Sequence, residues 1–263
     1  MGVLRLNYKK VKAEVGKGNY FSLDSSDFEK FSPDILGLGD LSTPGEYVEA
    51  LAAVFDLEGF TKFCNQSDPH LATPEFLSEF LKWLFDKLSS EITVKEDKTE
   101  KKMTLWCSLP FFSKFMGDGI LFLWDTTYAN SDREIGNVIL LLKRICAHYV
   151  SEFRPQIKNM VAGTPARLRC GIARGRIISV GNGEDFVGSC INIASRLQKL
   201  GQLSFCFARK GINPDLCFRP LSRKMFKAKQ VSIRGIGEEE LVVVVQAEFD
   251  ALSAKEKKIF SNP

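Results

Sequence analysis

The stretch Ala53-Val54-Phe55-Asp56-Leu57-Glu58-Gly59-Phe60-Thr61 decides the fold, because it predicts a buried strand that ends on a carboxylate beside a glycine. The apolar run begins near Tyr47 and is almost continuous after Glu49, as is typical of a buried strand. A second stretch, Lys114-Phe115-Met116-Gly117-Asp118-Gly119, also ends an apolar run on an aspartate between glycines. The two stretches therefore place Asp56 and Asp118 at strand ends, where loops leave room for a ligand.

The residues that follow Asp56 predict a long amphipathic helix. Thr73 is a candidate N-cap, with Pro74 at the first helical position. An apolar stripe then repeats every four residues and is widened by its neighbours. The stripe comprises Phe76, Phe80, Leu84 and Leu88, with Leu77, Leu81 and Phe85 beside them. Such a helix packs on a sheet.

The rest of the chain completes an α+β pattern. We expect a hairpin of 103–116 and 119–124 with 117–119 at its tip, a helix capped by Asn130 or Ser131, strands at 168–179 and 241–245, and a short helix at 191–200. The charged run 95–102 predicts a solvated loop. This order fits a ferredoxin-like fold, an antiparallel-rich sheet with helices on one face.

Length and composition favour one large domain with a substantial core. The chain has 263 residues, 44% of them hydrophobic, and a net charge of +4 that does not indicate a nucleic-acid binder. We expect an irregular N-terminal extension with a short initial strand at 1–45, one domain at 46–250 and a tail at 251–263. The seven scattered cysteines and the lack of a long apolar run predict a cytoplasmic protein without disulfides or a membrane span.

Asp56 and Asp118 are candidate ligands for divalent metal. Mg²⁺ and Mn²⁺ prefer oxygen ligands and often use one or two carboxylates together with substrate phosphates. Two ions held by two carboxylates can activate a hydroxyl and neutralise a leaving polyphosphate. Leu57 would add only its backbone carbonyl. The alternative is that each aspartate caps a turn near glycine.

The segment 58–61 predicts a turn from the strand into a short helix. Backbone N–H groups at such a helix start can hold phosphates, Gly59 permits close approach and Thr61 adds a hydroxyl. Phe60 belongs to this candidate nucleotide site, although a phenylalanine here is more often a core residue.

Asn192 and Arg196 lie four residues apart, so a helix places both on one face. A carboxamide can orient a ribose, and a guanidinium can stabilise charge that develops on a phosphate. Lys114 and Asp185 offer a donor and an acceptor to a base edge, and Arg234 lies in a glycine-bounded turn suited to a triphosphate. The alternative for each is an ordinary surface charge.

The two aspartate stretches and the segment 185–196, taken in this order, resemble the catalytic core of the class III nucleotidyl cyclases. The resemblance covers 47–200 and, more loosely, 234–245. It implies a homodimer with two shared sites, in which one protomer supplies the metal ligands Asp56 and Asp118. The other would supply Lys114, Asp185, Asn192, Arg196 and Arg234. The implied reaction is attack of the ribose 3′-hydroxyl on the α-phosphate, which gives a 3′,5′-cyclic nucleotide and pyrophosphate. Leu57-Glu58-Gly59 and Cys190 depart from commoner family residues without removing a catalytic group.

The base is left open by these residues. Lys114 and Asp185 match the positions that recognise adenine in adenylate cyclases. However, the edges of cytosine and uracil also present one hydrogen-bond donor beside one acceptor. Tyr47 is a candidate filler for a smaller base, or else a strand-packing residue. Around 55–66 and 114–125 the chain is similar to the bacterial pyrimidine cyclases of antiphage (Pycsar) systems, which make cyclic UMP or cyclic CMP for a separate effector. We therefore favour UTP, with CTP possible. The alternatives are a soluble adenylate cyclase, a catalytically silent nucleotide-binding regulator and, without its usual aromatic motif, a sheet-based RNA binder.

Overall fold

The computed structural model describes residues 9–12, 19–30, 32–66, 68–97, 99, 101–127 and 132–263. The chain divides into two units. The smaller comprises Met1–Tyr47 and Ile178–Val187, and the larger comprises Val48–Ile177 and Gly188–Pro263. The boundaries at 45 and 250 that the sequence suggests remain a prediction.

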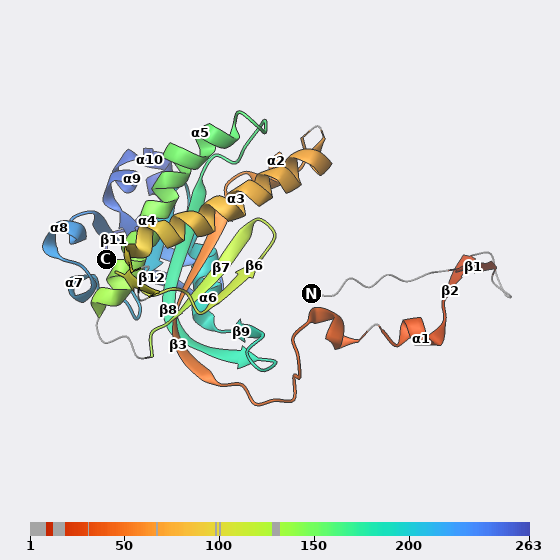
Figure 1. Ribbon diagram of the computed structural model, residues 1–263. Coiled ribbons are helices and arrows are strands. Elements are labelled where there is room, and N and C mark those ends of the chain that lie inside the picture. The colour runs from red at the N-terminus through yellow and green to blue at the C-terminus, as the bar shows by residue number, and fades with distance from the viewer. Residues whose placement is uncertain are drawn as a thin grey trace. The chain divides into compact units, whose positions relative to one another are not determined.

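The larger unit is a mixed sheet with helices packed on it (Figure 1). Its main sheet has the order β13-β11-β12-β10-β8-β3-β7-β6. The strands of this sheet are β3 (Tyr47–Leu57), β6 (Phe112–Phe115), β7 (Gly119–Asp125), β8 (Leu168–Val180), β10 (Phe205–Ala208), β11 (Phe226–Ile233), β12 (Gly237–Val245) and β13 (Phe260–Ser261). The helical segments are α2 (Phe60–Phe63), α3 (Pro69–Ile92), α4 (Asp132–His148), the π-helical turn η2 (Tyr149–Phe153), α5 (Arg154–Ile157), α6 (Ser189–Leu197), α7 (Pro214–Cys217), α8 (Pro220–Arg223), α9 (Gln246–Ala251) and α10 (Ala254–Lys257).

β3 is the buried strand that the first stretch predicts. Its residues from Ala50 to Leu57 are buried, and it pairs antiparallel with β7. In that register Asp56 lies opposite Gly119. The hairpin of β6 and β7 is also confirmed, because Phe115 pairs with Ile120 across the turn that holds Asp118. The two strand ends therefore meet at one end of the sheet.

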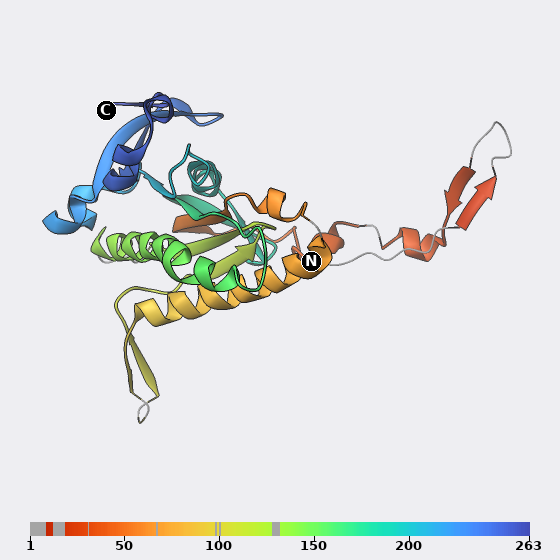
Figure 2. The ribbon, with the colours of Figure 1, turned by 90° about the horizontal axis from the view of Figure 1, so that it is seen from above.

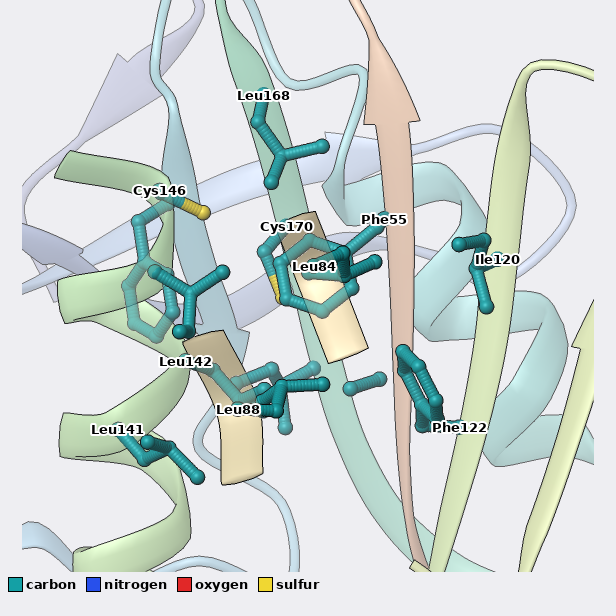
Figure 3. Packing of buried hydrophobic residues seen from close by; sticks show 14 of the residues in the cluster. Phe55, Leu84, Leu88, Ile120, Phe122, Leu141, Leu142, Cys146, Leu168 and Cys170 are labelled. Carbon is teal, nitrogen blue, oxygen red and sulfur yellow. The ribbon is translucent and has the colours of Figure 1, made fainter. Parts of the chain in front are cut away.

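One face of the sheet is covered by α3 and α4. The core on this side takes alternate residues of β3, among them Phe55, and packs them against Leu84 of α3 and Leu142 of α4 (Figure 3). Strands alternate their side chains between faces, so the intervening residues of β3 point to the other side. These residues, Ala52 and Val54, are also buried, and the second face therefore needs a cover of its own.

The second face is covered by α6, so the expectation of helices on one face is wrong. Figure 2 shows α6 on the side of the sheet opposite α3 and α4. α6 lies so close to β8 that a Cβ added at Gly171 would be 2.1 Å from the carbonyl oxygen of Ala194 and 2.4 Å from the backbone nitrogen of Gln198. A strand that is apolar on both sides requires this second layer.

We expect Gly171→Ala to destabilise the fold by about 1–3 kcal/mol, because the added methyl group meets backbone atoms of α6 that no rotamer change can move. Urea denaturation would measure the change. Gly175→Ala on the same strand is the matched control, since its Cβ would make an ordinary 3.4 Å contact with the Cys190 side chain. Equal stability of the two variants would contradict the close packing of α6.

α3 begins earlier than the sequence predicts. Its N-cap is Asp68 and Pro69 occupies the first turn, so Thr73 and Pro74 lie inside the helix. A proline lacks an N–H, and this costs little in the first turn of a helix, where the N–H groups have no partner within the helix. Pro69 occupies that turn. The apolar stripe is confirmed, since Phe76, Phe80, Leu84 and Leu88 are buried. Phe85, at 48% exposed, lies at the edge of the stripe.

The charged run 95–102 is not simply a loop. Two strands, β4 (Thr93–Asp97) and β5 (Lys102–Leu105), form a separate antiparallel sheet. Met103 to Leu105 therefore belong to this pair rather than to the hairpin of β6 and β7. Strand formation depends strongly on the partner strand, so the charge of the run alone did not reveal this pair.

The remaining expectations for the larger unit are confirmed in outline. The apolar side of α4 is buried at Ile135, Val138, Ile139, Leu142 and Ile145, and it continues through Tyr149 and Phe153 of η2. The strands β8 and β12 and the helix α6 occupy the segments in which they are expected. The cap at Asn130 or Ser131 lies outside the described residues.

The smaller unit contains β1 (Lys9–Lys12) and β2 (Asn19–Ser22), an antiparallel pair where one short strand is expected. α1 (Ser25–Phe28) and a 3-10 turn, η1 (Pro33–Leu36), follow. Its other segment includes β9 (Asp185–Val187), which pairs with the last residues of β8. The backbone N–H of Ser179 donates to the Glu46 carbonyl at 3.0 Å, so the two segments of this unit are hydrogen-bonded.

All seven cysteines are free thiols. Burial raises the pKa of Cys107, Cys190 and Cys217 to about 11. In the part of the chain that the structure describes, no helix combines the length and apolar character that crossing a bilayer requires.

Candidate active site

Asp56 and Asp118 are neighbours at the end of the β3–β7 pair. Asp56 is the penultimate residue of β3 and Asp118 directly precedes β7. The backbone N–H of Leu57 donates to the Asp118 carbonyl at 3.1 Å, so the hydrogen-bonded ladder itself holds the two aspartates together. The Leu57 side chain is buried, which leaves its backbone as the part able to contribute to a site.

Asp56 carries a partner that the sequence does not suggest. Although only 4% exposed, it accepts hydrogen bonds on Oδ2 from Arg169 Nε at 3.2 Å and Nη2 at 2.6 Å. Its other oxygen, Oδ1, lies 4.0 Å from the Lys199 ammonium. Arg169 lies on β8 between the buried residues Leu168 and Cys170, so an arginine between two apolar strand residues was the available signal.

The two carboxylates fit a hard divalent cation. They and the Leu57 carbonyl are oxygen donors, the ligand type that Mg²⁺ and Mn²⁺ prefer. Within the described ranges no three His, Cys, Asp or Glu side chains gather in a metal-binding group. Such a donor set suits ions completed by substrate phosphates rather than an all-protein cage.

We expect Asp56→Ala, measured without metal, to destabilise the protein by about 3 kcal/mol. The substitution removes the partner of the Arg169 guanidinium, which is poorly exposed to solvent. Asp118→Ala should cost less than about 1 kcal/mol, since Asp118 is only half-buried. Urea denaturation in EDTA compares the two variants. Equal losses would mean that the Asp56–Arg169 pair does not stabilise this strand end.

The loop after Asp56 turns into α2 as predicted. Gly59 adopts a φ of 85°, a left-handed conformation that favours glycine, and is the N-cap of α2. Glu58 is held in place by Arg167, whose Nε donates to Oε2 at 2.6 Å. Thr61 is exposed, whereas the Phe60 ring packs against Phe63 with centroids 5.8 Å apart. The side chain of Phe60 is therefore part of the core. If this residue contacts a nucleotide, the contact uses its backbone.

An open cavity of about 490 Å³ gathers three predicted residues. Asn192 and Arg196 reach it from α6, and Arg234 reaches it from the turn between β11 and β12. A Cβ added at Gly235 in that turn would lie 3.6 Å from Arg196 Nη2, which shows how closely the turn approaches α6. We call this space the α6 cavity.

The α6 cavity is cationic. Besides Arg196 and Arg234, Lys199 lines it, and Ser195 and Ser232 add hydroxyl groups. Among the described residues, those that line it include no aspartate or glutamate. Three cations without a carboxylate favour a polyanion such as a triphosphate. Lys199, which the sequence did not single out, also lies 4.0 Å from Asp56 Oδ1 of the same chain.

The other predicted residues lie elsewhere. Lys114 lies on β6 and is half-buried. Tyr47 and Asp185 belong to the smaller unit. Asp185 Oδ1 accepts the backbone N–H of Phe186 at 2.9 Å. Tyr47 is 67% exposed, so its side chain is not part of the buried core.

The fold is similar to solved structures of class III nucleotide cyclase catalytic domains. The adenylyl cyclase CyaB from P. aeruginosa aligns with a TM-score of 0.55 at 13% identity, over 77% of this chain and 96% of that one. The guanylyl cyclase Cya2 aligns with a TM-score of 0.48 at 15% identity, over 77% and 94% of the two chains. The catalytic core of a rhodopsin-guanylyl cyclase aligns with a TM-score of 0.48 at 14% identity, over 77% and 98%.

No protein-family model and no curated protein matches the chain. The likeness to CyaB shows the fold, which is the α+β fold of class III cyclases.

Proposed function

We propose that the protein is a nucleotide cyclase that converts a nucleoside triphosphate into its 3′,5′-cyclic monophosphate and pyrophosphate. The observation that carries the proposal is the α6 cavity, which gathers Asn192, Arg196 and Arg234 in one cationic space. The two carboxylates at the end of the β3–β7 pair add the metal-binding half of such a site. The fold shared with CyaB supports the same assignment.

The side chains divide the work of an in-line displacement. Arg234 and Lys199 hold the β- and γ-phosphates, Asn192 orients the ribose, and Arg196 stabilises the charge on the α-phosphate in the transition state. The bond from the 3′-oxygen to the α-phosphorus forms, and the bond between the α-phosphorus and the oxygen that bridges it to the β-phosphorus breaks. The hydroxyl proton leaves to solvent and pyrophosphate departs. Two Mg²⁺ or Mn²⁺ ions at Asp56, Asp118 and the Leu57 carbonyl would lower the pKa of the hydroxyl and neutralise the leaving group.

The working form we propose is a homodimer with two shared sites. Asn192, Arg196 and Arg234 are exposed in the single chain, and the cavity that they line is open. In the dimer, one protomer supplies Asp56 and Asp118, and its partner supplies the α6 cavity. A cyclic symmetric dimer makes two equivalent sites of this kind.

The base assignment is pyrimidine, with UTP favoured over CTP. Lys114 and Asp185 would supply a donor and an acceptor to the base edge, and Tyr47 would fill the space that a purine occupies. We extend the proposal to second-messenger synthesis in antiphage defence, with a separate effector as the reader of the product, on the basis of the sequence resemblance alone.

Product analysis tests the assignment. The purified protein is incubated with Mn²⁺ and, separately, with ATP, GTP, CTP and UTP, and the products are identified by mass spectrometry. Cyclic UMP is the expected product, and Tyr47→Ala should then lower the preference for UTP. Cyclic AMP would replace the pyrimidine assignment with that of an adenylate cyclase, which the Lys114 and Asp185 pair equally matches. The lack of a product from all four would favour a silent nucleotide-binding regulator.

A further inference from the structure

A second cavity lies outside the α6 cavity, in the larger unit. It has a volume of about 590 Å³ and lies between the loop that follows β3, the helix α5 and the segment 158–166. Pockets for small molecules in proteins commonly measure about 300–1,000 Å³. We call this space the α5 cavity.

The α5 cavity carries an excess of positive charge. Lys62 lines it from α2, and Arg154 and Lys158 line it from α5 and its C-cap. The carboxylate in its lining is Glu58, which already accepts hydrogen bonds from Arg167 Nε at 2.6 Å and Nη2 at 3.1 Å. Three cations therefore face the space, while the Glu58 carboxylate is neutralised. Such an arrangement favours an anion with several oxygens.

Two buried polar atoms in the lining have no hydrogen-bond partner among the described residues. They are Thr164 Oγ1 and Arg154 Nε. Thr164 is 8% exposed, and both residues line the cavity. A buried donor without a partner is unfavourable and rare in folded proteins, and a ligand oxygen is one way to satisfy it.

One part of the lining is apolar. Val161 and Pro165 contribute from the segment 158–166, and Val161 is itself buried in the core. Apolar walls with a few converging polar groups are typical of pockets that hold organic molecules. An inorganic anion alone would leave these walls without contacts.

We infer that the α5 cavity binds an organic phosphate, with its phosphate between Lys62, Arg154, Lys158 and the Thr164 hydroxyl and its organic part against Val161 and Pro165. The α5 cavity adjoins the candidate nucleotide site, with which it shares Gly59, and takes a second ligand. It shares Glu58 and Gly59 with the loop that directly follows Asp56. The backbone N–H of Ala166, in its lining, also donates to the Glu58 carbonyl at 3.1 Å. A ligand there contacts the same loop that positions the metal ligands.

Calorimetric titration with phenyl phosphate tests the inference. The full chain is used in metal-free buffer and carries Arg196→Ala and Arg234→Ala, so that the α6 cavity cannot account for the binding. We expect saturable binding at one site and weaker binding of inorganic phosphate. Lys158→Met and Thr164→Val should each weaken phenyl phosphate binding by about tenfold, the loss typical of one hydrogen bond to a charged group.

Lys255→Met is the matched control, because Lys255 is an exposed lysine on α10 and does not line the cavity. It should leave the affinity within about twofold. Thermal melts check that each variant is folded, and Lys158, which is exposed, decides the test if Thr164→Val unfolds. The inference is overturned by the absence of saturable binding, by binding that both variants leave intact, or by equal affinity for inorganic phosphate. Because the titration needs neither metal nor turnover, its failure and the failure of the proposed cyclase activity are separate results.

Discussion

Asp118→Ala is expected to lower the cyclisation rate by about 10³-fold or more. Metal ions stabilise transition-state charge by several kcal/mol, and each 1.36 kcal/mol is a factor of ten in rate. Asp118 lies beside Asp56 through the Leu57–Asp118 backbone hydrogen bond, so its loss removes half of the carboxylate pair. Initial rates with Mn²⁺ and the preferred triphosphate, measured as cyclic product, would show the effect.

The matched control for this variant is Asp125→Ala. Asp125 ends the same strand β7 at its other end, where its Oδ1 accepts the backbone N–H of Thr127 at 2.7 Å. We expect its activity to stay within about threefold of the unmodified protein. Sedimentation should give the same oligomeric state for both variants. Full activity of Asp118→Ala would remove it from the metal site.

Mixing inactive chains is expected to restore activity. Arg196→Ala should itself lose about 10²–10³-fold in rate, as expected for a group that stabilises transition-state charge. When Asp118→Ala and Arg196→Ala chains are mixed in equal amounts, half of the dimers are heterodimers, and each has one site with all its residues. The activity should then recover to about a quarter of that of the unmodified protein. Asp118 serves better here than Asp56, whose loss also leaves the buried Arg169 without its partner.

A second mixture controls this experiment. In a mixture of Asp118→Ala chains with Asp56→Asn chains, each chain lacks one of the two aspartates that it must supply to a site. No site of a heterodimer therefore has both aspartates. This mixture should remain inactive. If tagged heterodimers form in the first mixture but the activity does not recover, the site is contained in one chain and the shared-site proposal fails.

The strand β3, the β6–β7 hairpin and the buried stripe of α3 could be predicted from the sequence. Each shows in a pattern of neighbouring residues: an almost continuous apolar run for β3, two apolar runs around glycines for the hairpin, and a repeat of about four residues for the helix. The nearness of Asp56 and Asp118 has a different origin, because it depends on the pairing of β3 with β7, two strands from distant parts of the chain. The sequence implied it only through the resemblance to the cyclases. The gathering of Asn192 and Arg196 on one face of α6 is a local consequence of helical spacing.

The start of α3 and the β4–β5 ribbon were mispredicted because competing local signals looked alike. Pro69 and Pro74 both suit a first helical turn, and the surrounding structure selects Pro69. The charged run 95–102 resembles a loop in composition, and its strand pairing appears only when the two segments meet. Strand preference depends on the partner strand more than helix preference depends on its surroundings.

The tertiary structure alone decided what completes the candidate site. Arg169 meets Asp56 across 113 residues of chain, and Arg234 reaches α6 from a different hairpin. The same holds for α6, which the apolar second face of the sheet brings against Gly171. The sequence by itself determined which residues could carry the chemistry and which local elements hold them. Which charges face one another is a property of packing between distant segments, and local periodicity contains no information about it.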